Sequence, residues 1–184
     1  MRLGILGGTF DPVHHGHLIL ARAAMEQLGI DRVLFIPANI SPHKTGTVPA
    51  TAADRMEMLR LAIDGEPGFE ASDCELRRPA PSFTADTLRE IAAANPGAEL
   101  VLLIGADNAA KFDTWHKPDE IQTLARIAVL DRAQGADGCG WPVVRKLVDI
   151  SATDIRARVA AGRSIRYLTP DPVCGYITSN GLYR

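Results

Sequence analysis

Three histidines lie close together in the stretch GGTFDPVHHGHL, residues 7–18, at positions 14, 15 and 17. The stretch follows the apolar run LGIL and precedes LILARAAMEQLG, whose apolar residues recur with helical spacing. We therefore expect it to join a strand to a helix. A tight turn at such a junction needs glycine, but it has no need of imidazole groups, so the histidines require another explanation.

His14 and His17 are three residues apart at the expected start of that helix, so both can point toward its amino end. That end carries unpaired N–H groups and a partial positive charge, which favour an anion. Imidazole N–H groups would add donors for phosphate oxygens. The alternatives are helix-capping or surface histidines. A metal site is disfavoured, because the pair has no evident third ligand in the sequence and His15 should face elsewhere.

Gly7 and Gly8 directly follow the first expected strand. They complete neither the GxGxxG dinucleotide fingerprint nor the GxxxxGK[ST] P-loop. Two explanations stay open at this point. The glycines simply make a turn, or their missing Cβ atoms let a phosphate or nucleobase approach the backbone.

A second polar stretch, ISATDIR, covers residues 150–156. Ser151 and Asp154 fit the Ser-x-x-Asp pattern of a capping box, which starts a helix. Capping does not explain Thr153 and Arg156. A hydroxyl and a guanidinium at a helix start suit a triphosphate, which arginine can bind through two parallel hydrogen bonds.

The elements that would position these residues alternate along the chain. Strands are expected at 2–7, 32–37, 99–105 and 126–132, with a weaker one near 69–76, and helical periodicity separates them. The pattern predicts an α/β fold, Rossmann-like and doubly wound, with a mostly parallel sheet and helices on both faces. Ligands of such sheets bind beyond the carboxyl ends of the strands, where we expect residues 8–17, 38–46, 105–117 and 150–156.

Length and composition limit the classes of protein. The 184 residues predict one domain, 1–184, with a small C-terminal helical part from about 150 to 184. A net charge of −2 argues against a nucleic-acid partner, because there is no basic excess to neutralise phosphates. Three scattered cysteines favour a reducing compartment, and we find no signal peptide or membrane span. We therefore expect a cytoplasmic protein; a homo-oligomer stays open.

The motifs together resemble those of a known family. GGTFDPVHHGHL contains HxGH, and ISATDIR resembles the ISxTxIR signature, as in the HxGH nucleotidylyltransferase superfamily. IPANISPHK, PSFTADTL, GADN followed by TW, and GLYR are similar to motifs of the bacterial nicotinate-nucleotide adenylyltransferases, in the same order from residue 3 to 184. The resemblance implies transfer of AMP from ATP to nicotinate mononucleotide, giving deamido-NAD and pyrophosphate without a covalent intermediate, with Mg²⁺ bridging the phosphates.

Residue roles follow from the same resemblance. It implies catalytic roles for His14, His17 and Arg156, with His17 at the α-phosphate. It assigns to the ATP site Gly7, Gly8, Thr9, Phe10, His14, His17, Asp107, Ser151, Thr153 and Arg156. It assigns to the nicotinate mononucleotide site Asn39, His43, Lys44, Thr84, Trp115 and His116.

Within the second set, Trp115 would stack on the pyridine and Thr84 would hydrogen-bond its carboxylate. Packing and helix N-capping are the respective alternatives. The sequence departs from the family pattern at Ala152, which replaces a frequent hydroxyl, and at His116, where an aromatic residue is expected. The segment 133–148, which precedes the last motif, is also short.

Several functions compete with this one. The nearest use the same chemistry on nicotinamide mononucleotide or phosphopantetheine, and another is a non-catalytic nucleotide-binding regulator. Class I tRNA synthetases share HxGH, but this chain has no room for a tRNA-binding domain.

Overall fold

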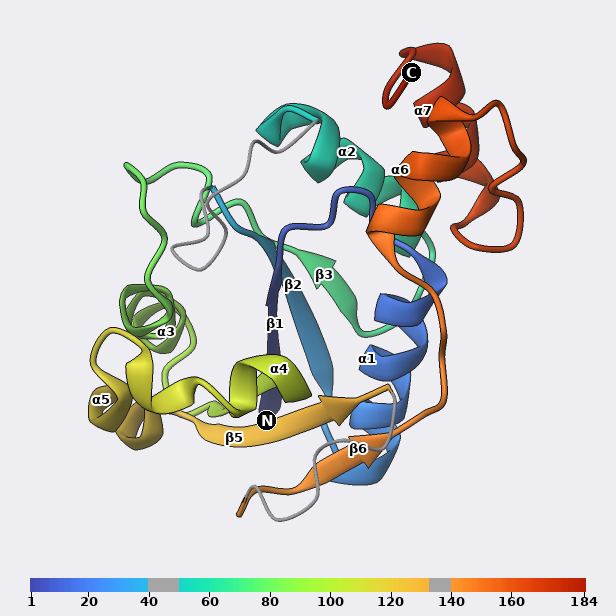
Figure 1. Cartoon of the computed structure of the whole chain (residues 1–184). Coiled ribbons are helices and arrows are strands. Elements are labelled where there is room, and N and C mark those ends of the chain that lie inside the picture. The colour runs from blue at the N-terminus through green and yellow to red at the C-terminus, as the bar shows by residue number, and fades with distance from the viewer. Residues whose placement is uncertain (40–49, 133–139) are drawn as a thin grey trace.

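A computed structural model of the chain describes residues 1–39, 50–132 and 140–184 (Figure 1). Within these ranges the strands are β1 (Arg2–Gly8), β2 (Arg32–Pro37), β3 (Phe69–Ala71), β4 (Glu99–Gly105), β5 (Arg126–Asp131) and β6 (Val143–Arg145). They form one six-stranded sheet in the order β3-β2-β1-β4-β5-β6, and all five pairings are parallel. The expected parallel sheet is confirmed.

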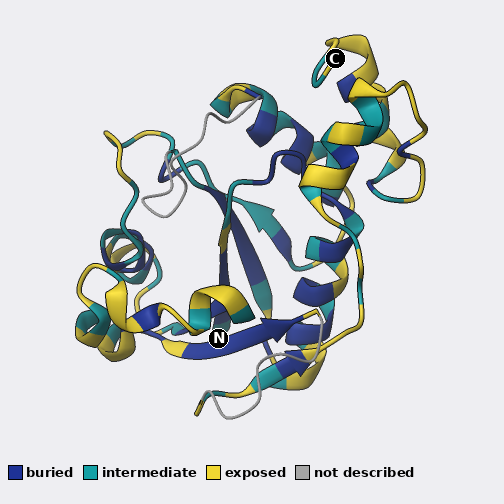
Figure 2. Cartoon of the chain, viewed as in Figure 1, coloured by how far each residue is buried: buried dark blue, intermediate teal, exposed yellow. Residues whose placement is uncertain are grey.

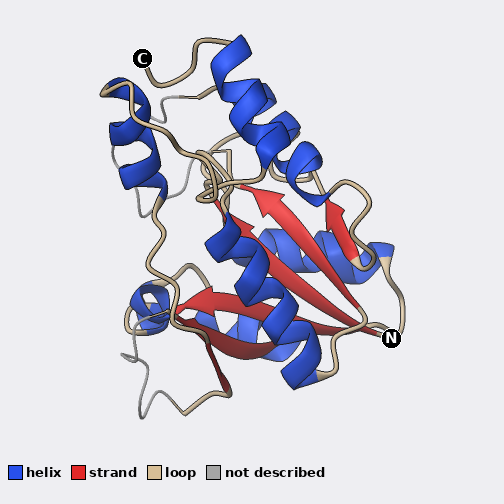
Figure 3. Ribbon diagram, turned by 90° about the vertical axis from the view of Figure 1, so that its right-hand side faces the viewer, coloured by secondary structure: helices blue, strands red, loops and turns tan. Residues whose placement is uncertain are grey.

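Helices cover both faces of this sheet (Figure 3). The elements are α1 (His15–Leu28), α2 (Ala52–Ile63), α3 (Thr84–Ala94), α4 (Ala106–Ala109), the 3₁₀ turn η1 (Phe112–Thr114), α5 (Pro118–Leu124), α6 (Ala152–Ala160) and α7 (Asp171–Ser179). Buried residues of α1, α2, α6 and α7 share one hydrophobic cluster, and those of α3 and α5 share the other. The chain is thus wound on both sides, as predicted.

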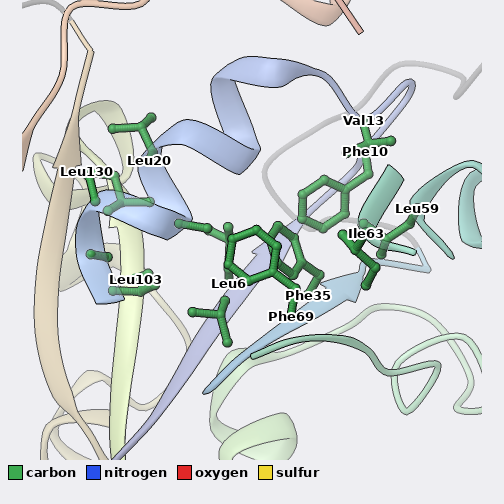
Figure 4. Packing of buried hydrophobic residues seen from close by; sticks show 14 of the residues in the cluster. Leu6, Phe10, Val13, Leu20, Phe35, Leu59, Ile63, Phe69, Leu103 and Leu130 are labelled. Carbon is green, nitrogen blue, oxygen red and sulfur yellow. The ribbon is translucent and has the colours of Figure 1, made fainter. Parts of the chain in front are cut away.

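Strand residues alternate between the two clusters because successive side chains of a strand point to opposite faces. In β1, Leu6 packs with the α1 side, whereas Leu3 and Ile5 pack with the α3 side. Figure 4 shows the α1-side cluster, where Phe10 and Leu6 meet Phe35 of β2. Burial is densest along the central strands and decreases toward the outer helix faces (Figure 2).

The differences from the sequence expectations are local. The strand expected near 69–76 ends at Ala71, and Cys74 and Glu75 lie in a turn instead. β6, α4 and η1 were not predicted, because each is only three or four residues long and cannot show a periodicity. Thr84 is the first residue of α3, whose N-cap is Phe83, so the N-cap alternative for Thr84 is wrong.

The strand order reverses direction between β1 and β4. From β1, one half of the sheet continues through β2 to β3, and the other continues through β4 to β6. A doubly wound sheet opens a crevice at this reversal, beyond the carboxyl ends of the two strands. Gly7 and Gly8 end β1 and Gly105 ends β4, so the glycine-rich stretch and GADN meet there.

Candidate active site

A cavity of about 1010 Å³ lies at this reversal. Its wall includes the last residues of β1 and β4, the start of α1, the turn before α3 and the segment between η1 and α5. Sites for small molecules commonly measure about 300–1,000 Å³, so this volume lies at the upper end of that range. The sequence-predicted residues that line it are Gly7, Gly8, Thr9, His14, His17, Thr84, Asp107, Trp115 and His116.

His14 and His17 stand together at the start of α1. Their rings are stacked with centroids 3.8 Å apart, and the edge of Phe10 packs on His17 at 5.0 Å. The backbone N–H of His14 donates to Nδ1 of His17 over 3.2 Å. Because Nδ1 accepts this bond, the proton of the neutral His17 ring lies on Nε2. His17 thereby presents an N–H donor from its far edge, as a phosphate-binding role requires.

The two histidines differ in burial. His14 is only 2% exposed, whereas His17 is half-buried. Burial, followed by the positive charges of Arg132 and His15, lowers the pKa of His14 to about 4. His14 is therefore a neutral ring at physiological pH. Position 14 therefore presents an uncharged imidazole to the cavity and no imidazolium charge.

The glycine of HxGH has a packing role. A Cβ on Gly16 would lie 3.0 Å from Cε1 and Nδ1 of His14. That distance is closer than ordinary van der Waals contact, so any larger residue would displace the His14 ring. The local geometry thus accounts for the motif. His14 and His17 are one helical turn apart, and Gly16 must leave room for the His14 ring.

Gly7 shows the opposite situation. A Cβ built on Gly7 would have no protein atom within 4 Å, and Gly7 lines the cavity. Its missing side chain therefore leaves open space in the cavity wall and serves no packing contact in the described structure. Of the two explanations that the sequence left open, close approach of a ligand to the backbone is favoured at Gly7.

The ISATDIR stretch lies beside this loop. Ser151 is the N-cap of α6 and accepts a hydrogen bond from the backbone N–H of Asp154, at 3.1 Å. Arg156 is half-buried and its Nη1 donates to the backbone oxygen of Asp11, at 2.7 Å. Ser151, Thr153 and Arg156 are not among the residues that line the cavity, so their contact with phosphates stays a prediction.

The other end of the cavity carries the aromatic groups. Trp115 is half-buried and packs on Phe112 with ring centroids 5.5 Å apart, and it also lines the cavity. His116 lies against Phe83 with centroids 4.4 Å apart. The departure at position 116 therefore leaves a ring contact in place. Thr84, at the first turn of α3, faces the same space.

Asn39 does not line the cavity, but it is hydrogen-bonded to the segment before α3, which does. Its backbone N–H donates to Oγ of Ser82, and its Nδ2 donates to the oxygen of Arg78. His43 and Lys44, which the resemblance assigns to the mononucleotide, lie outside the described residues. Phe10 is buried, is not among the residues that line the cavity, and contacts the His17 ring, so its part in ATP binding stays a prediction.

Sequence reasoning missed several residues around the cavity. Lys111 and Arg132 line it and add positive charge, and Glu75 lines it near Thr84. The carboxylate of Glu75 is buried and accepts from the hydroxyl of Thr87 at 2.7 Å, and burial raises its pKa. One available signal was the position of Arg132, a charged residue directly after a buried strand.

Two further observations concern the residues that the structure describes. Every helix in these ranges is too short or too polar to span a lipid bilayer. The same ranges contain no cluster of three His, Cys, Asp or Glu side chains that would hold a metal ion.

Comparisons with known proteins identify the family. A model of the cytidylyltransferase-like family matches residues 5–158. A probable nicotinate-nucleotide adenylyltransferase from Thermomicrobium roseum is 44% identical, over 100% of this chain and 92% of the relative. One from Exiguobacterium sibiricum is 41% identical over 100% and 99%.

A solved structure agrees with the fold. The nicotinic acid mononucleotide adenylyltransferase of Plasmodium falciparum, complexed with NaAD, aligns with a TM-score of 0.81 at 15% identity, covering 99% of this chain and 97% of that chain. At that identity the likeness concerns the fold. The family match and the two full-length relatives go further: this chain belongs to the cytidylyltransferase-like family and, within it, to the nicotinate-nucleotide adenylyltransferases.

Proposed function

We propose that this chain transfers AMP from ATP to nicotinate mononucleotide, forming deamido-NAD and pyrophosphate. The observation that carries the proposal is the lining of one cavity of about 1010 Å³. One end holds the stacked pair His14 and His17, and the other holds Trp115 with Thr84. A phosphate-binding end and an aromatic end in one space suit two nucleotides that react with each other.

The proposed chemistry is a direct displacement. A phosphate oxygen of the mononucleotide attacks the α-phosphorus of ATP, the bond between the α-phosphorus and the bridging oxygen breaks, and the electron pair leaves with pyrophosphate. Positioning and stabilisation of charge would supply most of the catalysis. The Nε2–H of His17 would donate to an α-phosphate oxygen, and neutral His14 would contribute a second ring N–H.

Arg156, Thr153 and the amino end of α6 at Ser151 would hold the leaving pyrophosphate. The bond of Arg156 to the Asp11 oxygen, which holds the guanidinium beside the loop, supports this role. Asp107, exposed after β4, would meet ribose hydroxyls of the adenosine. The histidine end offers ring nitrogens, whereas Mg²⁺ prefers oxygen ligands, so Mg²⁺ would be carried by the ATP phosphates.

We also infer the domain organisation, the partners and the location of the enzyme. We infer one nucleotidyltransferase domain over 1–184, and buried residues of α6 and α7 support this by sharing a cluster with Leu6 of β1. We infer ATP and nicotinate mononucleotide as partners, no nucleic acid and no membrane, and a cytoplasmic location, and a homo-oligomer stays open. Cys74 and Cys174 are free thiols, which suits a reducing compartment.

The proposed reaction is tested by pyrophosphate release from Mg-ATP with three acceptors offered in parallel. A strong preference for nicotinate mononucleotide over nicotinamide mononucleotide supports the assignment. Release with phosphopantetheine alone would keep the chemistry and overturn the acceptor. No release with any of the three, while ATP still binds by calorimetry, would favour a non-catalytic nucleotide-binding protein.

Replacing Trp115 with alanine is expected to raise the KM for nicotinate mononucleotide by about tenfold, because stacking on an aromatic ring contributes about 1–3 kcal/mol per base. The KM for ATP should change by less than twofold. The matched control is Trp141→Ala: Trp141 also packs on Phe112, with centroids 5.1 Å apart, but does not line the cavity. Equal changes in both KM values, or the same change in the control, would mean that Trp115 has only a packing role.

A further inference from the structure

The loop that leads into the two histidines is held from outside the cavity at alternate backbone oxygens. The oxygen of Thr9 accepts from Nη1 of Arg55 at 2.8 Å, and that of Asp11 accepts from Nη1 of Arg156 at 2.7 Å. The oxygen of Val13 accepts from Oγ1 of Thr169, also at 2.7 Å. The loop conformation is therefore fixed by side chains from α2, α6 and the segment before α7.

Much of this support comes from residues far away in the sequence. Arg156 and Thr169 both follow residue 150, and the backbone N–H of His15 also donates to the oxygen of Leu168 in that region, at 3.0 Å. In Figure 1 the dark blue loop after β1 passes between α2 and the orange helix α6. Residues 150–184 thus support one side of the loop that leads into the two histidines.

Asp11 is also held through its carboxylate. The residue is only 4% exposed, and its Oδ1 accepts from the hydroxyl of Tyr183 at 2.7 Å. A buried carboxylate is costly unless it is hydrogen-bonded. Burial, and then the bond to Asp11, raise the pKa of Tyr183 well above its usual range, so the phenol keeps its proton and remains the donor.

We propose that Tyr183 is a positioning residue for the phosphate end of the site, acting through Asp11 on His14 and His17. Asp11 is three residues before His14, and His14 in turn holds His17 through ring stacking and its backbone N–H. The proposal rests on the proposed function for the role of the histidines. The acceptor end is built from α3 and the segment after η1, which make no contact with Tyr183 in the described bonds, so the effect is directed at ATP.

The test compares Tyr183→Phe with Tyr176→Phe. Tyr176 is the matched control because its hydroxyl also donates to a carboxylate, Oδ1 of Asp54, at 2.9 Å, and that carboxylate belongs to α2 and not to the loop. Each change removes one oxygen atom and keeps the ring packing. Tyr183→Phe is expected to lower kcat/KM for ATP by about tenfold, less than the roughly 10²-fold that a 1 Å displacement can cost. The KM for nicotinate mononucleotide should stay within twofold in both variants.

A second measurement does not depend on the reaction. Amide hydrogen exchange of residues 9–17 in the ligand-free protein should become faster in Tyr183→Phe and remain unchanged in Tyr176→Phe. Normal exchange together with normal kcat/KM for ATP in Tyr183→Phe would overturn the proposal. Equal losses in both variants would assign the effect to general destabilisation and overturn it as well. If the wild-type protein shows no adenylyl transfer but exchange changes as expected, the proposed function fails and the positioning role stands.

Discussion

Replacing His17 with alanine is expected to lower turnover by about 10²-fold or more in a protein that still folds. The structure gives the reason. The backbone N–H of His14 occupies Nδ1 of His17, so Nε2 carries the proton and is a preset donor at the cavity. Loss of one such donor to developing negative charge typically costs about 10²–10³ in kcat. The fold should survive because His17 is half-buried at a helix start.

The measurement is kcat for pyrophosphate release at saturating ATP and nicotinate mononucleotide. His15→Ala is the matched control, since His15 is the neighbouring histidine in α1 and does not line the cavity. It should keep kcat within about twofold. Near-normal turnover in a folded His17→Ala protein would show that the His17 ring has no part in the chemical step.

The protein is also expected to lose stability on mild acidification because of His14. Its pKa is about 4 in the folded state, against 6.5 for an ordinary histidine. Between these values the unfolded chain binds a proton that the folded state does not, so the free energy of unfolding falls as pH falls. The contribution is fully present above pH 6.5, is lost progressively toward pH 4, and amounts to about 3 kcal/mol.

Denaturant unfolding at several pH values between 4 and 7.5 measures this loss. His14→Gln should be less stable than wild type at neutral pH, or similar to it, but the difference should shift in favour of the variant by up to about 3 kcal/mol as the pH falls to 4. His15→Gln should retain the wild-type loss. Parallel curves for wild type and His14→Gln would show that His14 titrates alike in both states, contrary to its burial.

Long elements were predictable from the sequence because burial sets the pattern of their apolar residues. The apolar run ELVLLIG became β4, covered on both faces, and RVLFIP became β2 with the expected bounds. The short β6 was not, because three residues carry no recognisable alternation.

The candidate site was predictable to the extent that its chemistry is local. His14, His17 and the glycines belong to one stretch, whereas Thr84 and Trp115 were predicted through the resemblance to the family. The supporting contacts join residues far apart in the sequence. Arg55 is a charged residue on a buried helix face, and Tyr183 lies 172 positions from Asp11. No local sequence pattern therefore shows that these side chains bond to the loop.

The two edges of the sheet bear on how the molecule behaves at high concentration. β3 and β6, at opposite edges, have three residues each, whereas the central β1 and β4 have seven. An exposed edge strand is a template for pairing with another chain, and a short one offers few unpaired backbone groups. Continuation of the sheet from one molecule into the next, the first step toward fibrous aggregation, is therefore disfavoured at both edges.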